Sequence, residues 1–129
     1  MLRHLTIRDF VIVDRLELEF AAGFGALTGE TGAGKSILID ALALALGERA
    51  DAGVVRAGCD KADVAATFDI GKLPQVGAWL AANDLEAEDE VILRRVLDAG
   101  GRSRGYINGS PATAQQLREV GEFLVDIHG

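Results

Sequence analysis

The sequence predicts an α/β fold in which an antiparallel sheet packs beside a strand, a glycine-rich loop and a buried helix. Three observations predict it. Residues Gly29-Glu30-Thr31-Gly32-Ala33-Gly34-Lys35-Ser36 match the pattern G-x-x-x-x-G-K-[ST] without a gap. An apolar run with helix-forming residues follows directly. Alternating strand patterns lie both before and after this unit.

Two strand patterns precede the glycine-rich loop. Residues 5–13 predict a first strand that bends near Asp9, and residues 16–20 alternate between apolar and acidic side chains, as a half-buried strand does. The short segment from Phe24 to Thr28 then predicts a buried strand that leads into the loop.

The run from Ile37 to Leu46 predicts a helix that is apolar on nearly every face. We therefore expect this helix to be buried rather than to lie on the surface. Gly47 is its candidate C-cap, because glycine adopts the left-handed conformation that commonly ends a helix. Residues 48–60 contain several glycine and alanine breaks and predict a long loop.

The second half of the chain alternates between predicted strands and helices. Its patterns predict strands over 64–69, 91–97 and 102–107, helices over 74–83 and 113–124, and the start of another strand over 125–127. Asn108-Gly109 predicts a tight turn after the strand over 102–107.

The glycine-rich motif has a chemical reason for its spacing. Its backbone N–H groups turn inward as an anion-binding nest, which requires conformations that glycine reaches at low cost. Lys35 places a positive charge on the β- and γ-phosphates of a nucleotide, and the Ser36 hydroxyl is positioned to ligate Mg²⁺. The helix that starts near Ile37 aims its N-terminal dipole at the same phosphates. The motif therefore predicts nucleotide binding.

Composition restricts the alternatives. The 129 residues are 49% hydrophobic, which suffices for one core and one domain. The net charge of −7 excludes a basic domain that coats nucleic acid by bulk electrostatics, so any DNA contact requires a local patch. The single cysteine, Cys59, excludes an internal disulfide and fits a reducing compartment. Neither a secretion signal nor a membrane span is evident, so we expect a soluble cytoplasmic protein.

The order of elements separates the classes of nucleotide-binding proteins. Two extra strand patterns precede the strand that leads into the loop, whereas small kinases and GTPases usually reach their loop after a single strand. In this layout and in its motifs the chain resembles the RecN family, a DNA-repair branch of the SMC (structural maintenance of chromosomes) proteins, which have heads of the ATP-binding-cassette type. The resemblance covers the whole chain. It includes the loop with Thr31 at its centre, the R-A-D segment over 49–51, the R-S-R-G-Y-I-N-G segment over 102–109, and the D-I-H-G segment over 126–129.

The resemblance implies that residues 1–129 form one N-terminal segment of an ATPase head. A coiled coil and a C-terminal head segment, which carries the Walker B carboxylates and the signature motif, lie outside it. It further implies ATP and Mg²⁺ as ligands, ATP-driven association of two heads in a homodimer, a role in double-strand-break repair and recombination, and nucleoid association. This segment alone is then expected not to hydrolyse ATP. The alternative is a kinase that transfers the γ-phosphoryl group of ATP to a small substrate.

Several side chains outside the loop are candidates for function. Arg56 matches the position at which SMC heads place an arginine toward the nucleotide or the partner head, although a solvated loop arginine would look the same. His128 is expected to complete a turn at the edge of the site. A second set could form a DNA-contacting patch on neighbouring strands, or an ordinary solvated sheet face: Arg94, Arg95, Arg102, Arg104 and Tyr106.

Overall fold

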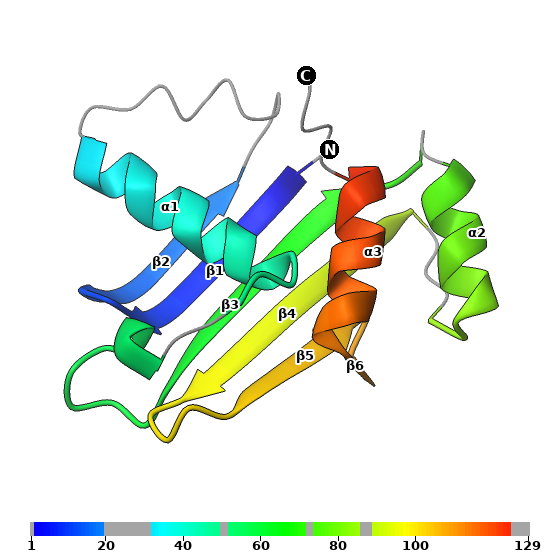
Figure 1. The fold of residues 1–129 in the computed structure, drawn as a ribbon. Coiled ribbons are helices and arrows are strands. Elements are labelled where there is room, and N and C mark those ends of the chain that lie inside the picture. Colours follow the sequence, from blue (N-terminus) through cyan, green and yellow to red (C-terminus); the bar gives the residue numbers. More distant parts are fainter. Residues whose placement is uncertain (1, 20–31, 50–51, 72–73, 86–88, 125–129) are drawn as a thin grey trace.

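The computed structural model describes residues 2–19, 32–49, 52–71, 74–85 and 89–124. Two layers make up this part of the chain, a twisted antiparallel sheet and a layer of helices on one of its faces (Figure 1). The predicted strands over 24–28 and 125–127 lie outside the described residues.

Within the described residues the sheet contains six strands in the order β2-β1-β3-β4-β5-β6, each antiparallel to its neighbours. Their bounds are β1 Leu2–Phe10, β2 Val13–Glu19, β3 Lys61–Asp69, β4 Glu90–Asp98, β5 Ser103–Ile107 and β6 Ser110–Ala112. The helices are α1 Gly32–Ala45, α2 Pro74–Ala82 and α3 Ala114–Leu124, with a short 3₁₀ turn η2 over Ala52–Val54.

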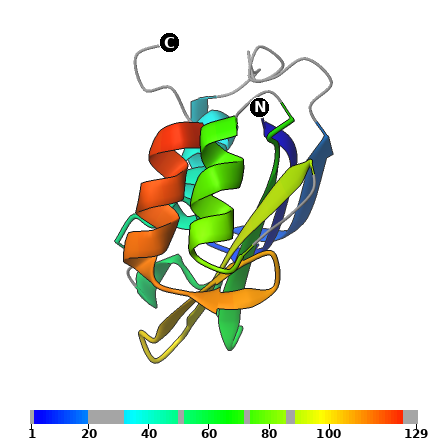
Figure 2. The ribbon, with the colours of Figure 1, turned by 90° about the vertical axis from the view of Figure 1, so that its right-hand side faces the viewer.

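All three helices lie on the same side of the sheet. Figure 2 shows α2 and α3 side by side to the left of the strands, and α1 crosses β1, β3 and β4 on that same side of the sheet. None of the described helices covers the other face of the sheet. We call the first the covered face and the second the open face.

The hydrophobic core lies between the covered face and the helices. Alternation along each strand directs one set of side chains inward, and β3 contributes Ala62, Val64, Ala66 and Phe68, each at most 1% exposed. The side chains between them lie on the open face, where β3 carries Lys61, Asp63 and Asp69. The predicted period-2 pattern of β3 is therefore confirmed.

The predicted C-terminal end of the first strand is wrong, because β1 ends at Phe10. Instead of continuing to Val13, the chain reverses at Val11 and Ile12, and β1 pairs back onto β2. Val11 adopts a φ of 56°, which a β-branched residue rarely does, and its N–H donates to the Val54 carbonyl at 2.6 Å. A contact with a segment more than forty residues away therefore helps to hold this turn, which the local pattern does not reveal.

The other predicted turn is confirmed. Asn108 and Gly109 have φ values of 52° and 84°, as a two-residue hairpin loop with both central residues at positive φ requires. The loop joins β5 to β6, a three-residue strand that was not predicted because it is short and contains Pro111.

Candidate nucleotide site and the two faces of the sheet

Helix α1 begins at Gly32, inside the glycine-rich motif. Gly29, Glu30 and Thr31 lie outside the described residues, and so do the side chains of the first turn up to Ser36. The first turn contains no acidic residue, so no side chain within it neutralises the positive end of the helix dipole. The helix start therefore fits an anionic group such as a phosphate.

The sheet holds α1 through its small and branched residues. Ala41 and Ala45 are fully buried and Leu44 is nearly so, which brings the helix close to β3. The expectation that the whole helix is buried is wrong for Ile39 and Asp40. Both are exposed, Ile39 by 52%, because only one side of α1 faces the sheet within the described structure.

The C-terminal end of α1 is capped as predicted. Gly47 has a φ of 93°, its N–H donates to the Leu44 carbonyl at 3.1 Å, and the Glu48 N–H donates to the Ala43 carbonyl at 3.0 Å. These two bonds form a Schellman motif. A Cβ atom at Gly47 would also lie 2.6 Å from the Ala114 carbonyl oxygen, so glycine lets the end of α1 approach the start of α3.

Arg95 has a different place from the one predicted. Instead of extending a DNA patch, it lies on the covered face and is only 4% exposed. Its Nη1 donates to the carbonyls of Leu44 and Glu48, both at 3.0 Å, and its Nε donates to Ser103 Oγ at 2.6 Å. Burial lowers the pKa of Arg95, with a further contribution from the charge of Arg118. A cation at the negative end of α1 therefore joins this helix to β4 and β5.

Arg56 lies beside the tip of the β1–β2 hairpin. Its Nη1 is 3.3 Å from Asp14 Oδ1 and 3.8 Å from Asp9 Oδ1, and its backbone N–H donates to the Asp9 carbonyl at 2.8 Å. Asp9, like Val11, has a positive φ, of 51°. The segment around Arg56 and the hairpin tip are therefore tied together by side chain and backbone. Asp9 and Asp14 were not predicted as partners of Arg56, since nothing in the local sequence links them.

The remaining residues of the predicted basic patch do lie together on the open face. Arg94 pairs across the strands with Tyr106, and its guanidinium carbon is 5.6 Å from the centre of the tyrosine ring. Two hydrogen bonds, of 3.0 and 2.5 Å, join Arg94 to Asp63 and raise the pKa of Arg94. Arg104 follows along β5, whereas Arg102 precedes the strand by one residue.

A pocket of about 240 Å³ brings these side chains together, and it includes Lys61, which was not predicted. Lys61 is the first residue of β3, two strands away from Arg104. Lys61 and Asp63 are two residues apart on the same strand, and strand alternation puts such residues on one face. This spacing is the signal that could have predicted the position of Lys61.

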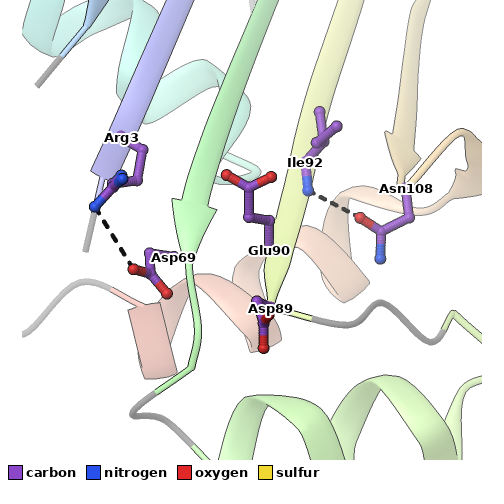
Figure 3. Close-up of a pocket in the computed structure, with 6 residues that line it drawn as sticks. All are labelled: Arg3, Asp69, Asp89, Glu90, Ile92 and Asn108. Atoms are coloured by element: carbon purple, nitrogen blue, oxygen red, sulfur yellow. Dashed lines mark hydrogen bonds and ion pairs between the residues drawn. The ribbon is translucent and has the colours of Figure 1, made fainter.

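The opposite end of the open face is acidic. Figure 3 shows a pocket of about 550 Å³ that is lined by Arg3, Asp69, Asp89, Glu90, Ile92 and Asn108. Arg3 Nη1 lies 3.7 Å from Asp69 Oδ2. The Asn108 amide is fixed at both ends, since its Oδ1 accepts the Ile92 N–H at 2.9 Å and its Nδ2 donates to the Leu85 carbonyl at 2.8 Å.

The histidines form no second site within the described ranges. His4 lies 3.2 Å from Glu17 across the β1–β2 pair, while His128 lies outside the described residues. Across the described ranges, no three His, Cys, Asp or Glu side chains are grouped so that they could hold a metal ion. In the same ranges, no helix is long and apolar enough to cross a membrane.

Comparison with known proteins identifies relatives for this arrangement. A family model described as "AAA domain" matches residues 4–116. The DNA repair protein RecN of Vibrio cholerae is 49% identical over 129 residues, and RecN of Bacillus subtilis is 40% identical over 130 residues. Both matches cover the whole chain, and the chain spans 23% of the length of each of these relatives.

A solved structure shares the fold. It comes from work on "ATP-driven dimerization and DNA stimulated activation of SMC ATPases", matches with a TM-score of 0.74 at 24% identity, and covers 95% of this chain and 78% of its own. The open antiparallel sheet with α1 across it therefore has the same fold as this SMC ATPase structure, as the order of elements predicts.

Proposed function

Because this chain belongs to the AAA-domain family, we propose that it is the ATP-binding segment of an SMC-like ATPase head that acts in DNA double-strand-break repair and recombination. The resemblance to RecN proteins is confirmed by relatives that match the chain from end to end. The observation that carries the proposal is the start of α1 inside the phosphate-loop motif, on a sheet with the fold of SMC heads.

The phosphate-loop residues are proposed to hold ATP and Mg²⁺. The N–H groups from Gly29 to Gly34 would bind the phosphates, Lys35 would neutralise the β- and γ-phosphates, and the Ser36 hydroxyl would ligate the metal. Mg²⁺ would supply further charge neutralisation at the phosphates. The absence of an acidic residue from the first turn of α1 is consistent with these roles, since both the helix dipole and the Lys35 charge favour an anion there.

Arg56 is proposed to reach the nucleotide or a second head. Its Nη1 is shared between Asp9 and Asp14, and the guanidinium also makes a hydrogen bond with the Cys59 thiol. These contacts would orient the guanidinium, and its remaining N–H donors would bind a phosphate.

Hydrolysis is proposed to need the C-terminal head segment. We infer from the resemblance to RecN proteins that the Walker B carboxylates and the signature motif would lie there, so residues 1–129 would bind ATP without turning it over. Two heads of a homodimer would close on two nucleotides and reopen after hydrolysis. The whole protein would act on DNA in the cytoplasm, in association with the nucleoid. The kinase alternative gains no support, because the sheet and its order match an SMC head.

Substitution of Lys35 in the full-length protein tests this proposal. Lys35→Ala removes a charge-assisted contact of about 1.5–3 kcal/mol, so ATP affinity should fall by roughly ten- to a hundred-fold. ATP-dependent association of heads, followed by sedimentation, should also be lost while circular dichroism stays unchanged. Ser36→Ala should act mainly on Mg²⁺ dependence and turnover. A folded Lys35→Ala protein that still associates in response to ATP would refute the assignment.

The 129-residue chain alone offers a second test. It should turn over ATP far more slowly than about 1 per second, the low end of ordinary enzyme rates. Addition of the C-terminal head segment should restore hydrolysis. The Lys35→Ala chain is the control for contaminating ATPases. An enzyme-like rate from the chain alone, absent in that control, would contradict the proposal that hydrolysis needs the C-terminal head segment.

A further inference from the structure

The open face of the sheet has a cationic groove at the end where β3 begins and β4 ends. Lys61 is in register with Asp98, which is joined to Arg102 by two hydrogen bonds of 2.9 Å. The next two rows along the strands place Arg104 beside Val96 and Tyr106 beside Arg94. These side chains line the pocket of about 240 Å³. Residues from three strands, separated by up to 45 positions, therefore meet on one surface.

The charges in this groove are not balanced. Four cations face two carboxylates, Asp63 and Asp98, and both hydrogen bonds from the Arg94 guanidinium go to Asp63. The side chains of Lys61, Arg102 and Arg104 make no ion pair with any residue that the structure describes. Three unpaired cations on a chain with a net charge of −7 form a local positive field that the overall composition does not predict.

The rest of the open face strengthens this polarity. Arg8 on β1 is in register with Asp63 and with Arg15 on β2, so the cationic end continues across the sheet. The other end carries the acidic pocket around Asp69 and Glu90. A polyanion would therefore be attracted to one end of this face and repelled from the other.

The aromatic residue in the groove already has a cation over one face of its ring. The guanidinium of Arg94 lies over the ring of Tyr106, and Asp63 holds Arg94 in that position. Sequence-tolerant binding of single strands relies on exposed aromatic rings on which bases stack. A groove with free cations and a covered ring instead suits phosphates, which carry the sequence-independent part of DNA binding.

We infer that this groove, made by Lys61, Arg94, Arg102, Arg104 and Tyr106, is a contact surface for the phosphate backbone of duplex DNA. The inference rests on the proposed function only in that the whole protein acts on DNA. Lys61, Arg102 and Arg104 supply the charge, while Arg94 and Tyr106 form the floor between them. Binding here is independent of base sequence, because contacts to phosphates carry no sequence information.

The test uses the full-length protein and a fluorescent 30-base-pair duplex, with affinity measured by anisotropy over a range of salt concentrations. Each phosphate contact contributes about −0.9 to the slope of log affinity against log salt. The triple variant Lys61→Ala, Arg102→Ala, Arg104→Ala should therefore lose about 2.7 from the magnitude of that slope, and its affinity should fall about tenfold or more at low salt.

Two matched variants separate this surface from general loss of charge. Arg3→Ala removes an arginine from the acidic end of the same face and should leave affinity and slope unchanged. Arg102→Lys with Arg104→Lys keeps the charge and should retain most of the binding. If the triple variant folds poorly by circular dichroism, the single variants Lys61→Gln, Arg102→Gln and Arg104→Gln replace it, each with an expected loss of about 0.9 in slope.

ATP binding, measured in the same samples, keeps the two proposals apart. The triple variant should bind ATP as the parent protein does, so a failure of nucleotide binding in the parent would count against the proposed function and not against this surface. An unchanged duplex affinity and salt slope in the triple variant would overturn the inference. So would a loss of affinity for single strands with duplex binding intact.

Discussion

Arg94 and Arg95 are adjacent in sequence, yet they lie on opposite faces of one strand and have opposite chemical surroundings. Arg95 is buried on the covered face and donates to two carbonyls and one hydroxyl, with no carboxylate among these partners. Arg94 is half exposed on the open face and pairs with Asp63 over the ring of Tyr106. Arg95 therefore holds helix α1 in place, whereas Arg94 shapes the open surface.

This difference shows that polar groups need protein partners on one face of the sheet and not on the other. On the covered face, every polar group needs a partner because water is absent, so a lost contact leaves unsatisfied atoms. On the open face, water can replace any partner, so charges there are free to serve a ligand. The two faces should therefore respond very differently to substitution.

The largest expected effect is at Gly47, on the covered side. Gly47→Ala forces a Cβ atom to within 2.6 Å of the Ala114 carbonyl at a φ of 93°. Backbone strain and overpacking together should lower the free energy of unfolding by about 4 kcal/mol, measured by urea denaturation. Gly101→Ala is the matched control, since Gly101 has a φ of 95° and nothing within 4 Å of the added atom. Equal losses in the two variants would mean that backbone strain alone, and not packing against α3, accounts for the lost free energy of unfolding.

The second effect compares the two arginines directly. Arg95→Met removes the donor for the Leu44 and Glu48 carbonyls and for Ser103 while it preserves much of the side-chain volume. We expect a loss of about 3 kcal/mol in the free energy of unfolding, because three hydrogen bonds from a charged group, one buried and two partly buried, are lost together. Arg94→Met is the control and should cost less than about 1 kcal/mol. A larger loss for Arg94 would reverse our assignment of the two roles.

A smaller effect is expected at the start of α3. The Thr113 hydroxyl accepts the Gln116 N–H at 3.0 Å, and Gln116 Oε1 accepts the Thr113 N–H at 2.9 Å, which together form a capping box. Thr113→Ala should lower the free energy of unfolding by about 1 kcal/mol, as seen by urea denaturation. Thr113→Ser retains the hydroxyl and should be close to neutral. A similar loss in both variants would indicate that the methyl group, not the cap, matters.

The smallest effect is expected on the open face. A double-mutant cycle with Arg94→Ala and Asp63→Ala measures the coupling of this exposed pair, and we expect at most about 1 kcal/mol. The coupling should decrease in high salt, since exposed charges are screened. A coupling of several kcal/mol that resists salt would show that the open face is covered in the intact protein, and the contrast between the two faces would then not hold.

The sequence by itself determined the features that depend on nearby residues. The glycine-rich motif and its helix, the alternation of β3, the Gly47 cap and the Asn108-Gly109 turn are all local, because backbone preference and hydrogen bonds within a few residues decide them. The alternation of β4 also separates Arg94 from Arg95, although the prediction of a joint patch passed over this.

Only the tertiary structure decided the rest. The reversal at Val11 relies on the carbonyl of Val54, Arg56 is oriented by Asp9 and Asp14, and Lys61 joins Arg104 across two strands. Each of these depends on groups far apart in sequence, whose proximity follows from the strand order and not from any local pattern. Burial then decides the role of each charge, because the same guanidinium that is screened by water on the open face must be fully hydrogen-bonded on the covered one.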